Sequence, residues 1–289
     1  MRYVEPVFRP PSEANSYLLP VTTGCSHNRC TYCAMYLTKS FRVRPEHEVF
    51  EDIETARAVM GDVRRVFLLD GDAFVLSPRK LLRILKAVRA AFPGLQRVGS
   101  YVNAQNVAGK SDEELREIAA AGLTIGYLGL ESGDPETALK IKKGATIDEM
   151  VEAVRRAQAA GIKMSVMSLL GMAGRADSLR HARATAMALN RMQPRYAAFL
   201  TVTPVAGTEL NDQIAEGTFE LISPEESLRE LREIVTHLDL SGTIFRANHA
   251  SNYLPLKGRF PADRERLLET IDAALEGRIS LKPEFLRGL

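Results

Sequence analysis

The sequence is poor in cysteine and has almost no excess of charge. Its 289 residues include three cysteines, and all of them lie between positions 25 and 33. No other cysteine in this sequence could pair with them, which excludes a disulfide scaffold. The formal net charge is +2 at pH 7, a balance that does not favour a nucleic-acid or membrane-surface binder, although a local basic patch stays open.

Long apolar runs are also missing. No stretch approaches the roughly 18 uninterrupted apolar residues of a membrane span. The first residues, MRYVEPVFRPPSEANSY, contain charges and three prolines where a signal peptide would have an apolar core. We therefore expect a protein without membrane insertion in the cytoplasm, where thiols stay reduced and can bind metal.

The chain does contain a regular alternation of short apolar runs and amphipathic stretches. The apolar runs predict six strands, at residues 16–24, 64–70, 97–103, 123–131, 163–171 and 196–204. Helical spacing predicts helices at residues 45–60, 78–92, 111–122, 134–142, 146–160 and 177–192, with capping boxes at Ser111 and Thr146. Apolar strands with few hairpin signals indicate a parallel sheet with helices outside it, which is an α/β fold.

After residue 204 the pattern loosens. We expect a helix at 224–238, a short strand at 243–247 and a helix at 262–275. No linker rich in Pro, Gly or Ser interrupts the chain, so residues 1–289 are interpreted as a single domain.

The cysteines have a spacing that suits a metal centre. Cys25, Cys30 and Cys33 stand in C-x4-C-x2-C order directly after the first predicted strand. A structural zinc site is closed by four protein ligands, whereas a [4Fe-4S] cluster held by three cysteines keeps one iron open. The count favours the cluster. Zinc with His27 as fourth ligand is the alternative, although His27 follows Cys25 too closely to close a tetrahedron well.

Three features together resemble the radical S-adenosylmethionine (SAM) superfamily: this loop, Tyr32 before its last cysteine, and six β-α units. The resemblance covers residues 16–205 and implies a partial (β/α)6 TIM-like barrel, with an α-rich extension at 206–289 closing the barrel mouth. It implies two cofactors: a [4Fe-4S] cluster on the three cysteines and S-adenosyl-L-methionine on its open iron. The commonest family spacing has one residue fewer between the first two cysteines, so this loop is a variant.

The resemblance also implies acidic contacts to the cofactor after the second strand. The family carries a small acidic motif there that receives the methionine amino group, and LLDGDAF places Asp70, Gly71 and Asp72 at this point. Carboxylate oxygens are suitable acceptors for a cationic amine. An aspartate beside Gly71 is equally a common turn former, which is the alternative for either residue.

The segment LGLESGDPETALKIKKGAT is similar to one shared by oxygen-independent coproporphyrinogen oxidase, the radical methylthiotransferases and the elongator-type enzymes. In that subgroup an acidic or amide residue contacts the ribose, and a basic residue further on contacts the methionine carboxylate. Glu131 and Lys143 stand at these positions. The alternatives are a helix cap for Glu131 and a solvated charge for Lys143.

Other strand ends complete the expected cofactor pocket. Tyr32, beside the last cysteine, is expected to contact the cofactor, and Ser100 and Asn103 end the third strand where a barrel mouth would lie. Gly171 and Gly174 end the fifth strand, as in family members whose backbone passes the adenine there. Loop hydrogen bonding is the alternative for Ser100 and Asn103.

The segment 245–264, FRANHASNYLPLKGRFPADR, concentrates polar groups after an apolar strand. His249 and Tyr253 are candidate catalytic residues, with Asn252 beside them on the substrate side, because such groups are typical of a substrate pocket. A surface loop of turn formers is the alternative. Arg42 and Arg44 could hold an anion or pair with the acids in residues 46–51.

These features predict a radical SAM enzyme that cleaves SAM reductively to a 5′-deoxyadenosyl radical, which takes hydrogen from a small-molecule or peptide substrate. An external electron donor of the flavodoxin or ferredoxin type is the expected partner. The alternatives are an RNA-modifying radical SAM enzyme and a non-catalytic zinc-binding barrel protein. Two features weigh against an RNA substrate. The net charge is near neutral, and residues 206–289 leave no room for the RNA-binding domain that is common in the radical methylthiotransferases.

Overall fold

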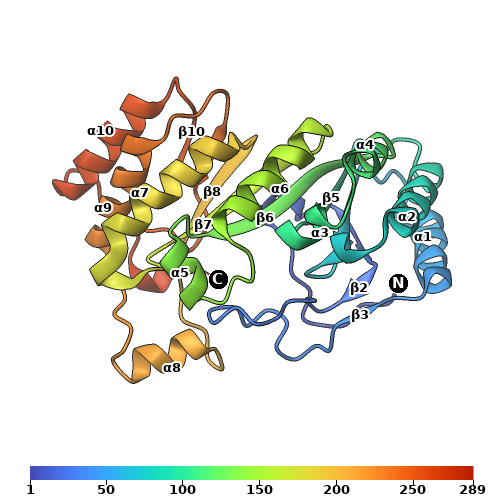
Figure 1. Cartoon of the computed structure of the whole chain (residues 1–289), viewed down its shortest axis with the longest axis horizontal. Helices are drawn as coiled ribbons and strands as arrows, with labels where there is room; N and C mark the ends of the chain where they lie inside the picture. Colours follow the sequence, from blue (N-terminus) through green and yellow to red (C-terminus); the bar gives the residue numbers. More distant parts are fainter. Residues whose placement is uncertain (289) are drawn as a thin grey trace. The chain divides into compact units, whose positions relative to one another are not determined.

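The strands form one eight-stranded, mostly parallel sheet. In the computed structural model, which describes residues 1–288, the strand order is β1-β4-β5-β6-β7-β8-β9-β10 (Figure 1). Pairings from β1 to β6 and from β7 to β9 are parallel, and β10 runs antiparallel to β9. A second, short sheet pairs β2 with β3. The α/β fold with a parallel sheet is thus confirmed.

The strands and helices follow one another in the predicted alternation. The strands are β1 (Tyr17–Pro20), β2 (Thr22–Thr23), β3 (Arg42–Val43), β4 (Arg65–Leu69), β5 (Arg97–Tyr101), β6 (Leu123–Glu131), β7 (Lys163–Leu170), β8 (Tyr196–Thr201), β9 (Ile244–Ala247) and β10 (Leu256–Arg259). The helices are α1 (Glu46–Met60), α2 (Pro78–Ala91), α3 (Ala104–Ala108), α4 (Asp112–Ala120), α5 (Pro135–Lys140), α6 (Ile147–Ala159), α7 (Gly174–Met192), α8 (Glu209–Ala215), α9 (Pro224–His237) and α10 (Arg264–Leu275). Three 3-10 turns are Pro11–Glu13, Ala73–Val75 and Glu284–Leu286.

The chain divides into two compact units, which we describe separately. Unit 1 comprises residues 1–28, 35–128 and 153–164, and unit 2 comprises residues 29–34, 129–152 and 165 onward. Within residues 1–288, no helix combines the length and the apolar character needed to cross a membrane.

Unit 1 is built on the parallel pairing of β1 with β4 and of β4 with β5. The side chains of β4 from Val66 to Leu69 are all buried, as expected for a strand covered on both faces. Helix α2 buries Leu81, Leu85 and Val88, which recur at helical spacing on one face. The register pairs Pro20 with Leu69, so the carboxyl ends of β1 and β4 lie side by side. Segments that follow these two strands therefore start from neighbouring points.

Unit 2 has three helices packed on one another. Helix α9 contacts both α7 and α10, and the three lie side by side in Figure 1. A capping box between Ser223 and Glu226 starts α9. The rings of Phe199, Phe245 and Phe260 stack in a buried row, with centroids 5.3 and 5.8 Å apart. Helix α9 is thus held between α7 and α10, and the phenylalanine row connects β8, β9 and the residue after β10.

Several short elements are absent from the sequence-based prediction. Strand β10 lies in the polar run Lys257-Gly258-Arg259, which carries no apolar alternation, and β2 and β3 have two residues each. Helices α3 and α8 are too short to show a helical period, although Asn103 and Thr208 cap them through their side chains. Caps are thus a better sequence signal than periodicity for such elements.

Candidate functional site

Glu131 and Lys143 meet at the end of β6 in unit 2. Lys143 Nζ donates a hydrogen bond to Glu131 Oε1 at 3.0 Å, and Glu131 is 7% exposed. The backbone of Glu131 has φ 61, a left-handed conformation that is uncommon for a residue other than glycine. Such strain is often found at functional positions. The two residues for which the resemblance implies separate contacts to the cofactor are therefore in direct contact with each other.

Gly129 makes room for this pair. A Cβ at Gly129 would lie 2.0 Å from Glu131 Oε1 and 3.0 Å from Lys143 Nζ. A side chain at this position would make the Glu131 carboxylate shift and would crowd the Lys143 ammonium. The carboxylate of Glu131 and the ammonium of Lys143 occupy the space that a Cβ would fill. We call this polar site above the backbone of residue 129 the Gly129 cradle.

Tyr32 and two of the cysteines belong to the same group. Burial raises the pKa of the Tyr32 phenol well above its usual range, and the Glu131 carboxylate, which accepts its hydrogen bond, adds to the rise. The Cys30 and Cys33 thiolates contribute to the same shift. Burial lowers the pKa of Lys143, but Glu131 and the two cysteines outweigh it, so that the pKa is raised and the ammonium stays charged.

The backbone holds the segment 29–34 in place within unit 2. The Thr31 N–H donates to Ile141 O at 3.2 Å, and the Leu210 N–H donates to Thr31 O at 2.9 Å. The Cys33 N–H donates to Cys30 O at 3.2 Å, which closes a turn between the two cysteines. Structure after α5 and the start of α8 thus fixes the cysteine segment beside the Glu131 pair.

Asp70 in unit 1 binds a lysine and a backbone N–H of its own unit. Its Oδ2 accepts hydrogen bonds from Lys39 Nζ at 2.8 Å and from the Gly24 N–H at 3.1 Å. Gly71 in turn donates its N–H to Gly24 O at 3.1 Å. Because Gly24 precedes Cys25, Asp70 fixes the point where the cysteine segment begins. Its other oxygen, Oδ1, is buried and has no hydrogen-bond partner within residues 1–288.

Gly71 is required where it stands. A Cβ there would lie 2.4 Å from the ring of Tyr36, which packs across the backbone after β4. The predicted Asp70-Gly71-Asp72 motif is therefore a tight backbone passage as well as a source of carboxylates.

Asp72 receives neutral donors instead of a cation. Its carboxylate accepts hydrogen bonds from Ser26 Oγ, from Asn103 Nδ2 at 3.1 Å and from Asn106 Nδ2, and it is 1% exposed. Burial raises its pKa more than these hydrogen bonds lower it. Asn103 also caps α3 by accepting from the Asn106 N–H at 2.8 Å. Asn103 thus contacts Asp72 and caps α3, and its expected contact with the cofactor stays a prediction.

Ser100, unlike Asn103, has no described bond to Asp72. Lys110, a further neighbour of Asp72, was not predicted from the sequence. Ser100 is fully buried and donates to its neighbour Tyr101 O at 2.9 Å, so its hydroxyl is used within the strand end. Burial lowers the pKa of Lys110 to about 8, and Lys110 Nζ donates to Phe74 O at 2.8 Å. Asn106 and Lys110 near Asp72 were missed because they lie outside the motifs used, and Ser26 was missed because only the cysteines, His27 and Tyr32 of the cysteine segment were considered.

The C-terminal candidates His249, Asn252 and Tyr253 each bind different partners. His249 Nδ1 accepts from the Ser251 N–H at 3.1 Å, which is a local turn. Asn252 binds strand β8 through Thr201 Oγ1 at 2.9 Å and Phe199 O at 2.8 Å. These bonds explain why the polar run follows β9: several of its side chains satisfy the backbone and hydroxyl groups of β8.

Tyr253 is engaged by the end of the described chain. Its hydroxyl donates to Glu284 Oε2 at 2.9 Å and accepts from Arg287, whose guanidinium lies 4.1 Å from the ring centroid. Burial and the Glu284 contact raise the pKa of Tyr253 to about 12. The hydroxyl is therefore protonated at neutral pH and held by the C-terminal segment.

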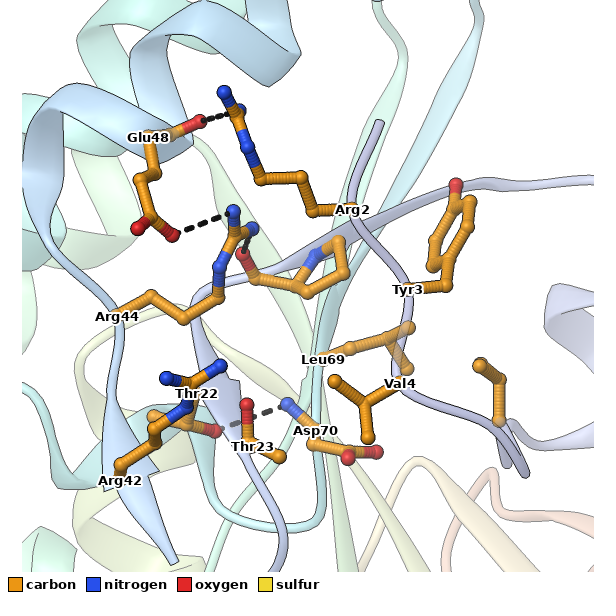
Figure 2. Close-up of a pocket in the computed structure, with 12 residues that line it drawn as sticks. Arg2, Tyr3, Val4, Thr22, Thr23, Arg42, Arg44, Glu48, Leu69 and Asp70 are labelled. Atoms are coloured by element: carbon orange, nitrogen blue, oxygen red, sulfur yellow. Dashed lines mark hydrogen bonds and ion pairs between the residues drawn. The ribbon is translucent and has the colours of Figure 1, made fainter.

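The arginines near the cysteine segment border a pocket of about 160 Å³ in unit 1 (Figure 2). Arg44 is bonded to Glu48 at 3.1 Å and to Asp52 at 2.8 Å, so it pairs with acids of α1. Arg42 lines the same pocket beside Thr22 and Thr23. The pairing alternative therefore holds for Arg44.

The donor set fits the implied cofactors. The three cysteines are half-buried and form no disulfide, and two of them lie with Tyr32, Glu131 and Lys143. Among residues 1–288, no group of three or more His, Cys, Asp or Glu side chains is already arranged around a metal position. Thiolates suit iron, and the Gly129 cradle presents a carboxylate for hydroxyl groups and an ammonium for a carboxylate.

Comparison with known proteins gives one family. The model of the Radical SAM superfamily matches residues 19–185, which is more than half of the chain. The uncharacterized methyltransferase PH0819 of Pyrococcus horikoshii is 25% identical over 189 residues, which cover 65% of this chain and 39% of that protein. Biotin synthase of Prochlorococcus marinus is 27% identical over 215 residues, which cover 71% of this chain and 58% of that protein. The chain thus spans less than two thirds of either relative.

A solved structure shows the same fold. Coproporphyrinogen III oxidase (HemN) from Escherichia coli, described as a radical SAM enzyme, superposes with a TM-score of 0.56 at 14% sequence identity. The superposition covers 76% of this chain and 51% of that one. At this identity the likeness concerns the backbone fold, in which the β-α units expected from the sequence recur.

Proposed function

The chain belongs to the radical SAM superfamily and is an enzyme, and we propose that it cleaves SAM reductively at a three-cysteine [4Fe-4S] cluster to modify a small-molecule or peptide substrate. When bound, the cluster supplies one electron, and the cleaved cofactor supplies a 5′-deoxyadenosyl radical that takes a hydrogen atom from the substrate. Cys25, Cys30 and Cys33 are the proposed cluster ligands.

One observation carries the proposal: Tyr32, Cys30, Cys33, Glu131 and Lys143 converge at the end of β6. Glu131 presents carboxylate oxygens, which accept hydrogen bonds from ribose hydroxyls. Lys143 keeps its charge because its pKa is raised, and an ammonium suits the methionine carboxylate. The Tyr32 phenol stays protonated and orients Glu131 through their hydrogen bond.

Further cofactor-binding residues are proposed in unit 1, described by itself. Asp72 would receive the methionine amino group, and Gly71, Ser100 and Asn103 are the other cofactor-binding residues proposed there. Asp70 would act mainly by fixing Gly24, and so the start of the cysteine segment, through the bonds described above. Lys110, whose pKa is lowered by burial, is an additional polar neighbour of Asp72.

The substrate side is proposed for residues 206–289, with this extension closing the barrel mouth. Such closure excludes water and other groups that the radical would attack. His249 and Tyr253 remain the proposed catalytic candidates, and a flavodoxin- or ferredoxin-type protein remains the proposed electron donor. A cytoplasmic location is part of the same proposal, because the thiols must stay reduced to hold iron.

The test is anaerobic reconstitution with iron and sulfide, followed by SAM and dithionite. We expect 5′-deoxyadenosine by mass spectrometry, with none from the triple variant in which Cys25, Cys30 and Cys33 are changed to Ala. The variant has the same length and barrel, so it controls for nonspecific reduction of SAM. Stoichiometric zinc without iron in anaerobically purified protein, together with no 5′-deoxyadenosine, would contradict the proposal and support the zinc alternative.

A further inference from the structure

A buried carboxylate without a cation lies among α9, α7 and two strand-end turns of unit 2. Glu230 in α9 is 0% exposed. Its Oε1 accepts the Gly171 N–H at 2.7 Å, and its Oε2 accepts the hydroxyl of Ser178. Gly171 directly follows β7 and Ser178 lies in the first part of α7, so one carboxylate binds both sides of the β7–α7 connection.

His181 extends these contacts to the turn after β6. His181 is fully buried, and its Nε2 lies 3.5 Å from Glu230 Oε1. Its Nδ1 lies 2.7 Å from Ser132 Oγ, and that oxygen also accepts the Asp134 N–H at 3.0 Å. Because Ser132 follows Glu131 directly, the contacts run from Glu230 to the residue next to the proposed ribose ligand.

The hydrogen bonds around His181 indicate which ring nitrogen carries the proton. Burial lowers the pKa of His181 to about 4, so its ring is neutral at physiological pH. Ser132 Oγ accepts the Asp134 N–H, so its hydroxyl hydrogen is available to His181 Nδ1, and the ring proton is assigned to Nε2, which lies 3.5 Å from Glu230 Oε1 without a hydrogen bond to it. The neutral ring thus lies between the donating hydroxyl of Ser132 and the carboxylate of Glu230.

Other charged groups on the packed elements are directed elsewhere. On α7, Arg175 pairs with Glu220 and Glu226, and Arg183 pairs with Glu233 of α9, all in exposed or half-buried positions. Arg180 pairs with Asp134, Glu136 and Asp177, and Arg232 of α9 pairs with Asp272 of α10. The only titratable group with a described contact to Glu230 within residues 1–288 is therefore His181.

This arrangement is costly as a purely structural device. Burying a carboxylate without a cation is unfavourable, and an apolar side chain of similar volume is often neutral or stabilising at such positions. Burial raises the pKa of Glu230 to about 7, which reflects the same cost. What an apolar side chain cannot do is hold the Gly171 N–H, which belongs to a residue with φ 81.

We propose that Glu230 is a positioning residue for SAM: through Gly171, and through His181 and Ser132, it holds the turns after β7 and β6 in the conformation that receives the cofactor. This inference rests on the proposed function, because it concerns the same site. Glu230 itself touches neither cofactor nor substrate and acts through these turns.

The test compares Glu230→Leu, Glu230→Gln and the control Glu233→Gln in the full reconstituted chain. Glu233 lies on the same helix and also bonds α7, through Arg183, but it contacts neither turn. We expect Glu230→Leu to weaken SAM binding about tenfold in equilibrium dialysis, a size typical of groups that orient ligands. Its melting temperature should stay at or above that of the wild type. At about pH 8, Glu230→Gln, which keeps an acceptor for Gly171 but loses the second one, should bind SAM less tightly than the wild type and more tightly than Glu230→Leu, whereas Glu233→Gln should bind within about twofold of the wild type.

A second readout needs no cofactor. In the protein as purified, amide hydrogen exchange should be faster in Glu230→Leu for peptides that contain residues 132–134 and 171–178, and unchanged in Glu233→Gln. Equal SAM affinity and equal exchange in Glu230→Leu and wild type would overturn the inference. An equal loss in Glu233→Gln would also overturn it, because it would indicate general loosening between α7 and α9.

A pH series covers the case in which Glu230→Leu does not fold. Protonation removes one acceptor from Glu230, so wild-type affinity for SAM should fall toward that of Glu230→Gln between about pH 8 and about pH 6, while the affinity of Glu230→Gln stays constant over this range. Parallel curves would overturn the inference. Wild-type protein that does not bind SAM at all would contradict the proposed function itself, whereas wild-type binding with no effect of position 230 would remove only the role of Glu230.

Discussion

Two buried carboxylates, one in each unit, are stabilised in different ways. Asp70 in unit 1 forms an ion pair with Lys39, and both side chains are nearly inaccessible to solvent. Glu230 in unit 2 is equally buried but is bonded to neutral donors, with His181 as its titratable neighbour. The Asp70 carboxylate is stabilised by the opposite charge of Lys39, whereas the Glu230 carboxyl has no cation beside it and titrates near neutral pH. Both hold a glycine N–H beside a segment of the proposed site.

The largest effect is expected from breaking the ion pair of unit 1. Lys39→Met leaves Asp70 buried without its cation, which should lower the free energy of unfolding by about 3–5 kcal/mol. Urea unfolding followed by circular dichroism measures this. The double variant Lys39→Met with Asp70→Asn removes the charge as well and should recover much of the loss. A double variant as unstable as the single one would show that the ion pair is not the cause.

The next effect is a pH dependence that comes from Glu230. Its folded pKa, about 7, lies above the ordinary value of 4.5, so the unfolded chain releases this proton first. Stability from this group is complete below about pH 4.5 and falls as pH rises to about 7. The loss amounts to roughly 3 kcal/mol, and Glu230→Gln should lack it. Melting curves of both proteins at about pH 5 and about pH 8 test this: a constant difference would contradict the assignment.

A smaller effect on stability and a clear effect on binding are expected at Glu131. Glu131→Gln keeps the size of the side chain but removes the charge that faces Lys143, and should weaken SAM binding about tenfold, which is about 1.4 kcal/mol. Its unfolding free energy should change by less, because the pair is only partly enclosed. Equilibrium dialysis and urea unfolding separate the two quantities. Glu136→Gln, an exposed carboxylate of α5, is the matched control and should bind SAM as the wild type does.

The smallest effect on stability is expected at Tyr253. Tyr253→Phe removes the hydroxyl that binds Glu284 and Arg287 and should cost at most about 1 kcal/mol, because the contact is near the surface. If Tyr253 has the proposed catalytic role, product formation should fall far more than stability once a substrate is identified. Equal product formation by Tyr253→Phe would restrict the residue to anchoring the C-terminal segment.

Much of the fold follows from the sequence because its signals are local. The six β-α units show apolar strands and amphipathic helices, and the capping boxes at Ser111 and Thr146 form as expected. Strand β10 could not be expected from the run around Lys257, since its pairing with β9 depends on tertiary contact. Where a short polar run becomes a strand is decided by the neighbouring strand.

The site was predictable in part. The resemblance pointed to Glu131 and Lys143 as separate contacts to the cofactor, and the structure brings the two residues into contact with each other and with Tyr32. The partners of Asp70 could not be read from the motif, because Lys39 reaches it from a loop 31 positions earlier in the chain. Glu230 carried no sequence signal, since a glutamate in an amphipathic helix is usually exposed. Burial, which only the structure gives, distinguishes it from its helix neighbours.

The central claim is that an open iron of a three-cysteine cluster receives SAM beside Glu131 and Lys143. Electron paramagnetic resonance of the anaerobically reconstituted, dithionite-reduced protein tests this most directly. The account predicts a [4Fe-4S]⁺ signal whose g-values shift when SAM is added, with a reduced response to SAM in Lys143→Met. A reduced cluster whose spectrum is unaffected by saturating SAM, or no cluster signal at all, would contradict it.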